Sequence, residues 1–292
     1  MIKILTTDDL RETKQHGHPD FQLEYYLDDI REYFNNQLDW HWHNEFEIVL
    51  VKKGVITFHI GRDTLILNEG EAIFINSKIL HQFTAEDYGL LPNIVFAPEF
   101  IASEQTVIYQ KYVAPVENSP IDYVILKTEC KWQNQILSLL AEMFLQLSSG
   151  KFHELQIRNI LCEAWLILTE HIQPLISETS HRKTAGSSYN SVMVMIQYIR
   201  SHYMESISLE DISSVAKISK NTAIRYFNAN IAMSPVDYLI KCRISTACKL
   251  LKETADKISH IALSVGYENT GYFCRLFKKC TGLSPKEYRQ TL

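Results

Sequence analysis

The feature that most constrains this 292-residue chain is a repeat in its C-terminal third. Two short patterns recur 50 residues apart: Arg225-x-Phe227 as Arg275-x-Phe277, and Ser234-Pro235-x-x-Tyr238 as Ser284-Pro285-x-x-Tyr288. Upstream, Leu209-x-x-Ile212 matches Ile258-x-x-Ile261 at a distance of 49 residues. Self-similarity at a fixed spacing is typical of two copies of one supersecondary unit.

Each copy has the pattern of a helix, a tight turn and a second helix. In the first copy Ser208 can cap a helix over 209–216, with Asp211 near its N3 position, and Ser219 can cap a helix to about residue 229. In the second copy a helix over 257–265 follows Asp256, Gly266 supplies a sharp turn, and Asn269 opens the next helix. A helix over 235–252 connects the copies.

Both Ser-Pro pairs place a capping serine before a proline at the first helical position. Glu287, three residues after Ser284, completes a capping box. These local patterns support the helix starts that the repeat predicts.

Two short helices joined by a tight turn allow the second helix to lie in the major groove of DNA. Polar side chains on the exposed faces of these second helices could read bases, since Arg can pair with guanine and Asn with adenine. The candidates are Asn221, Arg225, Thr270 and Arg275. Lysines and one arginine could neutralise phosphates, namely Lys220, Lys278, Lys279, Lys241 and Arg243. The alternatives are solvated surface charges for the lysines and helix-surface ion pairs for Arg225 and Arg275.

The charge of the chain is divided unevenly. Residues 191–292 hold 14 Lys and Arg against 8 Asp and Glu, a net charge of +6, whereas the remainder holds 15 against 26, a net charge of −11. This asymmetry favours the C-terminal part as the one that meets a polyanion.

The second copy carries a long motif that resembles a known family. The run Ile261-Ala262-x-x-Val265-Gly266-Tyr267-x-x-x-x-Tyr272-Phe273-x-Arg275-x-Phe277-Lys278-Lys279-x-x-Gly282-x-Ser284-Pro285-x-x-Tyr288-Arg289 resembles the signature of the AraC/XylS transcription regulators. The first copy departs from it, because Ala232 stands where Gly282 does, and Ala223 and Ile224 replace a commoner polar and apolar pair. In that family the first recognition helix usually dominates specificity, so the DNA target stays open.

Upstream, two further patterns follow each other. Residues about 20–126 show many short alternating segments separated by turn residues, which predict a sandwich or small barrel of β-strands. Residues about 131–172 have helical periodicity, interrupted at Ser148-Ser-Gly150, and residues 177–190 are small and polar. We therefore expect an α+β chain with a barrel domain over 1–176, a linker over 177–190 and an all-α DNA-binding domain over 191–292.

The pattern His41-x-His43-x3-Glu47-x6-Gly54 is the chemically most suggestive part of the barrel region. Side chains two apart on a strand share a face, so these residues and the later His81 can converge. The spacing resembles the first cupin motif, and Gly70 and His81 keep part of the second, with Asn76 and Lys78 in place of the usual Pro and Gly. The resemblance implies a small barrel.

Three interpretations of His41, His43, Glu47 and His81 remain open. They could line the pocket of a small-molecule effector, with a sugar as one candidate, bind a divalent metal, or form a structural hydrogen-bonded cluster. Aromatic side chains could supply the walls of such a pocket or belong to the core, namely Tyr25, Trp40, Trp42 and Phe58.

The sequence therefore predicts a transcription regulator rather than an enzyme, with double-stranded DNA and an effector as ligands and no firm cofactor beyond a candidate divalent metal. The resemblance to AraC/XylS regulators also implies a homodimer, with RNA polymerase as a candidate partner. A metal-dependent cupin enzyme with a helical appendage, and a barrel that docks a protein, are the competing functions. Whether the regulator is an activator or a repressor stays open.

Two further patterns bear on location. The chain has no apolar run long enough for a membrane span and no N-terminal secretory pattern, which predicts a cytoplasmic protein without membrane contact. Its six cysteines form no C-x-x-C pair and are expected to be reduced.

Overall fold

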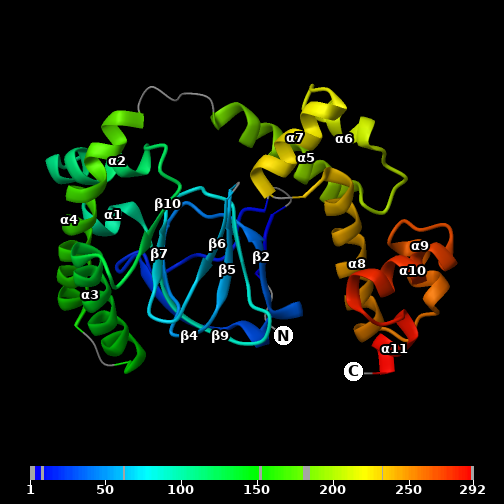
Figure 1. The fold of residues 1–292 in the computed structure, drawn as a ribbon, viewed down its shortest axis with the longest axis horizontal. Coiled ribbons are helices and arrows are strands. Elements are labelled where there is room, and N and C mark those ends of the chain that lie inside the picture. Colours follow the sequence, from blue (N-terminus) through cyan, green and yellow to red (C-terminus); the bar gives the residue numbers. More distant parts are fainter. Residues whose placement is uncertain are drawn as a thin grey trace. The chain divides into compact units, whose positions relative to one another are not determined.

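The computed structural model describes residues 4–7, 10–61, 63–150, 153–179, 185–231 and 233–290. The chain divides into two compact units, Met1–Gly186 and Ser187–Leu292. The first combines β-sheets with helices and the second is helical (Figure 1). The predicted α+β class is therefore confirmed.

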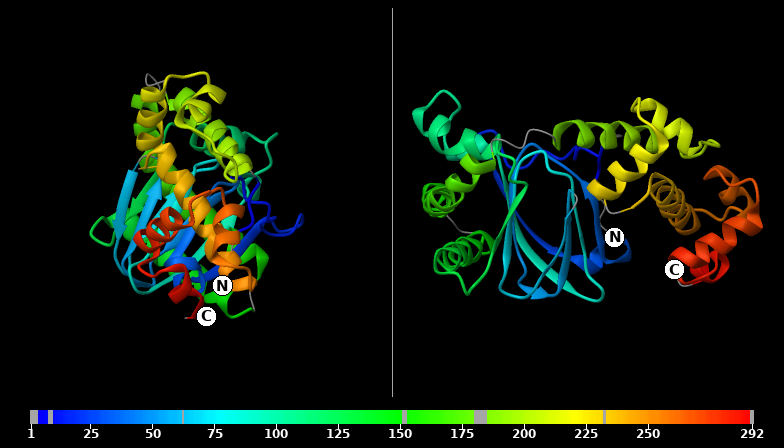
Figure 2. Two further views of the ribbon diagram at one scale, coloured as in Figure 1. Left: turned by 90° about the vertical axis from the view of Figure 1, so that its right-hand side faces the viewer. Right: turned by 45° about the horizontal axis from the view of Figure 1, so that its top comes forward.

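Two antiparallel sheets form the centre of the first unit. One has the strand order β1 (Leu23–Asp29), β9 (Gly89–Phe96), β3 (Phe46–Leu50), β7 (Ala72–Ile75) and β10 (Tyr123–Leu126), with β4 (Lys53–Gly54) also paired to β9. The other has the order β2 (Gln37–His41), β8 (His81–Thr84), β5 (Ile56–Ile60) and β6 (Asp63–Leu67). The two sheets enclose the predicted barrel (Figure 2, right).

The pleat of β3 separates the two apolar clusters of this unit. Phe46 and Ile48 point to a cluster shared with the helices, whereas Val49 and, just beyond the strand, Val51 point to a second cluster between the sheets. Glu47 shares the inward face with Val49, because side chains alternate along a strand. Strand β3 thus contributes side chains to both apolar clusters and places the Glu47 carboxylate inside the barrel.

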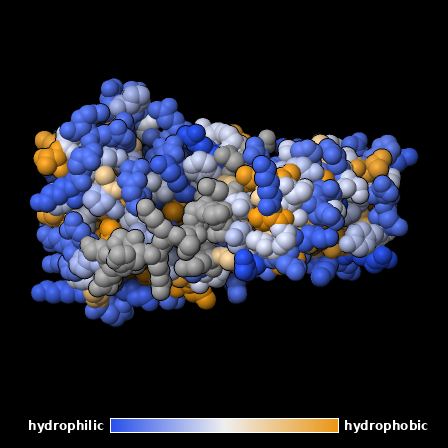
Figure 3. All heavy atoms as spheres, turned by 90° about the horizontal axis from the view of Figure 1, so that it is seen from above, coloured by the Kyte–Doolittle hydropathy of each residue, from blue (hydrophilic) through white to orange (hydrophobic). Residues whose placement is uncertain are grey.

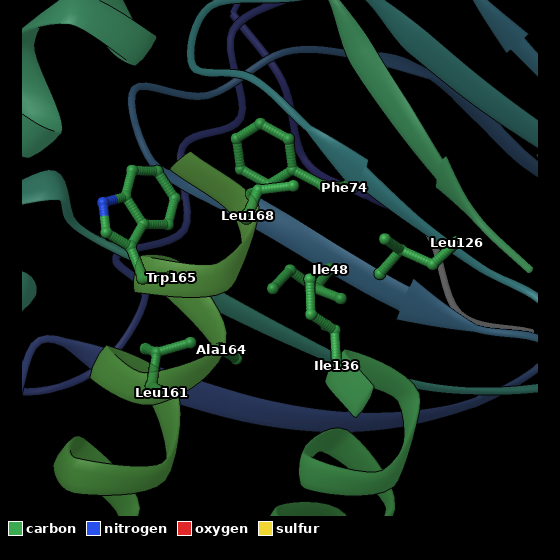
Figure 4. Close-up of a pocket in the computed structure, with 8 residues that line it drawn as sticks. All are labelled: Ile48, Phe74, Leu126, Ile136, Leu161, Ala164, Trp165 and Leu168. Atoms are coloured by element: carbon green, nitrogen blue, oxygen red, sulfur yellow. The ribbon is translucent and has the colours of Figure 1, made fainter. Parts of the chain in front are cut away.

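The longest helices of this unit cover the outer face of the larger sheet. Helices α3 (Lys131–Ser148) and α4 (Glu154–Thr179) pack with strands β3, β7 and β10 around Trp165 (Figure 4). The Trp165 ring lies 4.9 Å from that of Phe46, and its indole nitrogen donates to the Tyr112 carbonyl over 3.0 Å. Only a cavity of about 10 Å³ remains at this contact, so the helices are closely fitted to the sheet.

Shorter helical segments complete the first unit. They are η1 (Ile30–Glu32), η2 (Phe34–Asn36), α1 (Pro98–Ile101), the π-helix η3 (Tyr109–Val113) and α2 (Ala114–Glu117).

The second unit contains the predicted pair of helical copies. Its helices are α5 (Ala185–His202), α6 (Leu209–Val215), α7 (Lys220–Ile231), α8 (Pro235–Glu253), α9 (Ile258–Ser264), α10 (Thr270–Thr281) and α11 (Pro285–Gln290). The capping box of Ser208 and Asp211 is present, and so is the one between Ser284 and Glu287.

The helices extend into the segment that the sequence assigns to a linker. Helix α4 continues to Thr179 and α5 begins at Ala185, while residues 180–184 lie outside the described part of the chain. Small and polar residues, Gly186 among them, can lie in a helix, because each lowers the helix propensity by about 1 kcal/mol or less.

The described helices include none that is long and apolar enough to cross a membrane. On the face of the molecule shown in Figure 3, hydrophilic residues predominate and hydrophobic ones lie in small separate groups.

Trp165→Ala should lower the free energy of unfolding by about 3–5 kcal/mol, because it empties the centre of the contact between helices and sheet. Urea unfolding followed by circular dichroism measures the change. The matched control is Glu163→Ala, an exposed position on the same helix, which should change stability by less than about 0.5 kcal/mol. Equal losses in the two variants would contradict this packing.

Candidate functional site

The second helices of the two copies, α7 and α10, turn their apolar residues inward. Ala223, Phe227 and Ile231 are buried on α7, and Phe273 and Phe277 are buried on α10. The opposite faces carry the residues that the sequence assigned to DNA contact. Lys220, Asn221, Arg225, Arg275, Lys278 and Lys279 are exposed, and Thr270 is half-buried.

Two more exposed side chains share these helices, Asn228 on α7 and Tyr272 on α10. Asn228 follows Arg225 by three positions and therefore lies on the same helical face. Sequence inspection did not assign either residue to DNA contact, although the repeat, which aligns Phe227 with Phe277 as inward residues, indicates the outward faces on which both lie.

The few contacts of these exposed residues leave their charges accessible. Lys220 reaches Glu210 over 3.0 Å, with both side chains more than half exposed, and Arg225 lies 5.4 Å from the Tyr226 ring centroid. Surface pairs of this kind contribute little to stability, so they do not explain why the positive charges are there.

The turns of the two copies use the same backbone conformation. Lys217 has φ +54° in the first copy, and Gly266, which follows 49 residues later, has φ +84° in the second. A side-chain Cβ on Gly266 would lie 2.7 Å from the Tyr203 carbonyl oxygen, so glycine is required there for space as well as for conformation.

In the barrel, His41, His43, Glu47 and His81 converge, each at most 4% exposed. His41 ends β2, His43 follows it, Glu47 lies on β3 and His81 begins β8. One potential ligand atom from each lies within 4.8 Å of the others. Glu47 Oε2 is 3.3 Å from His43 Nε2 and 3.1 Å from His81 Nε2.

Backbone carbonyls fix the orientation of these three imidazoles. The Nδ1 atoms of His41, His43 and His81 lie 2.9, 3.1 and 2.7 Å from the carbonyl oxygens of residues 39, 45 and 79. A carbonyl oxygen only accepts, so each Nδ1 carries a proton and each Nε2 points toward the cluster, as an acceptor in the neutral imidazole and as a donor in the protonated one.

The burial of this cluster shifts its titration. Burial alone would raise the pKa of Glu47, but hydrogen bonds and charge from His43 and His81 outweigh it and lower that pKa. Burial, followed by the charges of His81 and His43, lowers the pKa of His41 well below its ordinary value.

A cavity of about 380 Å³ opens beside the cluster. Its lining also includes Asp28, which accepts hydrogen bonds from the Tyr33 hydroxyl and from Asn93 Nδ2, the latter over 2.7 Å. Burial raises the pKa of Asp28 in spite of these bonds. The cavity is large enough for a small molecule and lined by several polar groups, which is the usual composition of a ligand site.

The four aromatic residues considered from the sequence lie outside the lining of this cavity, and Trp40 and Phe58 belong to the buried core, as one of the two interpretations had it. Tyr26 and Tyr33 line it, whereas Trp40 and Phe58 are buried outside its lining and Tyr25 packs against the Phe144 ring on the helix side. Trp42 stacks with the Arg11 guanidinium. Neighbouring residues of a strand face opposite sides, so a shift of one position exchanges Tyr25 for Tyr26.

Comparison with known proteins matches one family model to the barrel region and another to the helical C-terminal region. An AraC-like ligand binding domain matches residues 30–164, and a helix-turn-helix domain matches residues 212–291. The chain belongs to the AraC/XylS family of transcription regulators. It is thus a DNA-binding regulator with a ligand-binding domain, and not an enzyme, which removes the competing function of a metal-dependent cupin enzyme.

Individual relatives match all or part of this AraC/XylS chain. An uncharacterised HTH-type transcriptional regulator, YdeC of Bacillus subtilis (strain 168), is 26% identical over 99% of each chain. The HTH-type transcriptional activator RhaS of Escherichia fergusonii is 24% identical over 86% of this chain and 87% of its own. The solved C-terminal domain of the two-component response regulator yesN from Fusobacterium nucleatum is 31% identical, with a TM-score of 0.33, over 34% of this chain and 98% of its own.

The AraC/XylS chain departs from the sequence prediction at Arg243, which does not face solvent. Arg243 is 9% exposed, and its Nε and Nη2 donate to the carbonyls of Tyr203 and Glu205, each over 2.7 Å. Its guanidinium also lies 5.0 Å from the Tyr267 ring centroid. Arg243 sits on the buried face of α8 with Ile244 and Ala247, so it joins the helices rather than binding phosphate.

Arg243→Ala should lower the free energy of unfolding by about 3 kcal/mol, because a buried side chain is lost and two backbone carbonyls lose a charged donor. Thermal unfolding, compared with the exposed Lys249→Ala variant on the same helix, measures this loss. If stability were unchanged while the salt dependence of DNA binding decreased, Arg243 would be a phosphate ligand after all.

Proposed function

We propose that this regulator reads DNA through the outward faces of α7 and α10, and that a small molecule in the barrel cavity controls that binding. The main support for DNA binding through these faces is an exposed arginine at matching positions of the two copies, Arg225 and Arg275. Each arginine precedes a buried phenylalanine by two residues. Packing accounts for the phenylalanines, but it does not require an arginine at the exposed position twice.

The two helices have different parts in this proposal. Asn221 and Arg225 lie four residues apart on α7 and contact base edges, and Thr270 and Arg275 do so from α10. Lys220, Lys278 and Lys279 contact phosphates, which adds affinity without sequence preference.

In the barrel we propose that His41, His43, Glu47 and His81 form the polar end of the effector site. The donor set also fits a divalent metal ion. Three imidazoles and a carboxylate form a ligand set of the kind that binds zinc, nickel or cobalt, and the buried Nε2 of His81 has no partner among the described residues apart from Glu47 Oε2, 3.1 Å away. Such an ion would supply a fixed positive charge to which an oxygen of the effector could bind.

We further propose that the regulator acts as a homodimer in the cytoplasm. Leucines are exposed along the helices that cover the barrel, including Leu155 (71% exposed) and Leu166 (46% exposed) on α4. They are 11 residues apart, close to three helical turns, so they lie on one face. Relatives named as transcriptional activators support activation, in which case RNA polymerase is a further partner.

Arg225→Ala and Arg275→Ala should each weaken binding to the target promoter by about 5- to 150-fold, as expected for the loss of one bidentate base contact. Fluorescence anisotropy with promoter DNA from the gene's own neighbourhood, against random DNA at two salt concentrations, measures this change. The control is Lys252→Ala, exposed on α8 away from both recognition helices. Unchanged discrimination between the two DNAs in both arginine variants would refute the assignment.

Leu155→Glu combined with Leu166→Glu should convert the dimer to a monomer, since two charges would enter an apolar contact. Light scattering after size-exclusion chromatography measures the mass. Val55→Glu, at an equally exposed apolar residue outside α3 and α4, is the control. A dimer that survives both leucine changes would place the interface elsewhere.

A further inference from the structure

The N-terminal segment brings a second carboxylate and a fourth imidazole to the barrel cluster. His16 Nε2 lies 3.3 Å from Glu12 Oε2, and the same oxygen lies 4.0 Å from His41 Nε2. The ring centroid of His16 is 5.2 Å from that of His43. His16 is 7% exposed and the Glu12 side chain 9%, so both are buried although they precede the first strand.

This segment is held against the barrel by backbone hydrogen bonds. The Glu12 amide donates to the Trp42 carbonyl over 2.8 Å, and the Trp42 amide donates to the Leu10 carbonyl over 3.1 Å. Trp42 lies between His41 and His43, so the bonds that hold the segment are adjacent to two members of the cluster. A shift of the segment would therefore displace Glu12 from His41.

Carboxylates outnumber lysines and arginines in the described lining of this cavity. Glu12, Asp28 and Glu47 all line it, whereas Lys14 is the only Lys or Arg in the described lining. Lys14 Nζ lies 4.0 Å over the Tyr26 ring, and its charge also acts on Asp28. Buried carboxylates without a counter-charge are costly, which favours a cation between them.

The imidazoles cannot supply that cation in their observed orientation without taking up protons. The Nε2 lone pairs of His43 and His81 face Glu47, so acceptor faces acceptor unless a proton or a metal ion lies between them. Among the described residues, the buried Nε2 of His16 has no partner apart from Glu12 Oε2 at 3.3 Å, and that of His81 has none apart from Glu47 Oε2 at 3.1 Å.

We infer that Glu12 is an additional ligand of a divalent metal ion held by His41, His43, Glu47 and His81, and that His16 positions Glu12. The inference rests on the proposed metal site of the barrel. His16 Nδ1 lies 2.9 Å from the Tyr26 hydroxyl, which can donate to it, so Nε2 can carry the proton and donate to Glu12. Metal binding then fastens residues 10–16 to the barrel.

The test uses the full-length protein without an affinity tag, freed of metal by a chelator and titrated calorimetrically with Zn²⁺ and with Co²⁺. One ion should bind per chain. His81→Ala should abolish binding, and Glu12→Gln should weaken it about 10- to 100-fold, while His16→Asn should weaken it less than Glu12→Gln does. His18→Gln, an exposed histidine on the same segment, is the matched control and should bind as the unchanged protein does.

Two readouts separate ligation by Glu12 from a merely structural role. The visible spectrum of bound Co²⁺ should differ between Glu12→Gln and the unchanged protein. Hydrogen exchange of the peptide over 10–16 should slow on metal addition, and this slowing should be lost in Glu12→Gln.

The outcomes distinguish this inference from the proposed site. Stoichiometric binding that His81→Ala removes but Glu12→Gln leaves unchanged would overturn the role of Glu12 while keeping the metal site. Failure to bind one ion per chain would overturn both and leave a hydrogen-bonded cluster. Neither result bears on DNA recognition by α7 and α10, which the anisotropy measurements test independently.

Discussion

The burial of Glu47 inside the barrel is the constraint on which the organisation of the first unit depends. The pleat of β3 places Phe46 and Ile48 among the helices and Glu47 beside Val49 among the inward residues. A lone carboxylate there would be costly, so the surrounding imidazoles must be fixed with their Nε2 atoms toward it. Three backbone carbonyls accept from the Nδ1 atoms and set that orientation. The loops that carry His43 and His81 are therefore built around the cluster. Lys78 adopts φ +61° at a position where the cupin motif has glycine, and its amide donates to the His43 carbonyl.

The second unit depends on a different constraint, the close approach of backbone at the turns of its two copies. Gly266 lies against the Tyr203 carbonyl, and Arg243 fills the space beside it and binds the same carbonyl. This contact joins the segment after α5, helix α8 and the α9–α10 turn, so the recognition helix α10 is positioned by buried and half-buried residues. In the first copy Lys217 adopts the corresponding conformation with no such glycine requirement. The two copies share one geometry, but only the second is held by this contact, which explains why its motif is the more complete.

Much of this arrangement could be predicted because it follows from periodicity. The repeat gave the helices of both copies, and the burial of Phe227 and Phe277 fixes which face of α7 and α10 is exposed. The His-x-His-x3-Glu spacing identified His41, His43 and Glu47, and the partly kept second cupin motif added His81. Glu12 and His16 could not be found in this way, because they lie in an irregular segment whose position depends on pairing with Trp42. Arg243 was misassigned for a related reason, since a charged residue on a long helix is usually exposed and only tertiary contacts reveal the buried carbonyls that bind it.

Arg243 and Glu12 differ in what their burial requires. Both are charged residues removed from water, and both meet backbone or side-chain groups from segments distant in sequence. Arg243 finds two carbonyl acceptors and an aromatic ring, so its hydrogen-bonding capacity is largely used and its charge is stabilised within the fold. Within the described part of the chain, the Glu12 carboxylate lies against imidazole nitrogens of His16 and His41, whose charge depends on protonation. A buried charged side chain whose hydrogen bonds are all supplied by the fold has a structural role. When the counter-charge must instead come from a proton or an ion, the stability of the segment that carries the side chain depends on whether that proton or ion is bound. By that criterion the N-terminal segment, unlike the α8 contact, is the part of this regulator whose order can respond to a ligand.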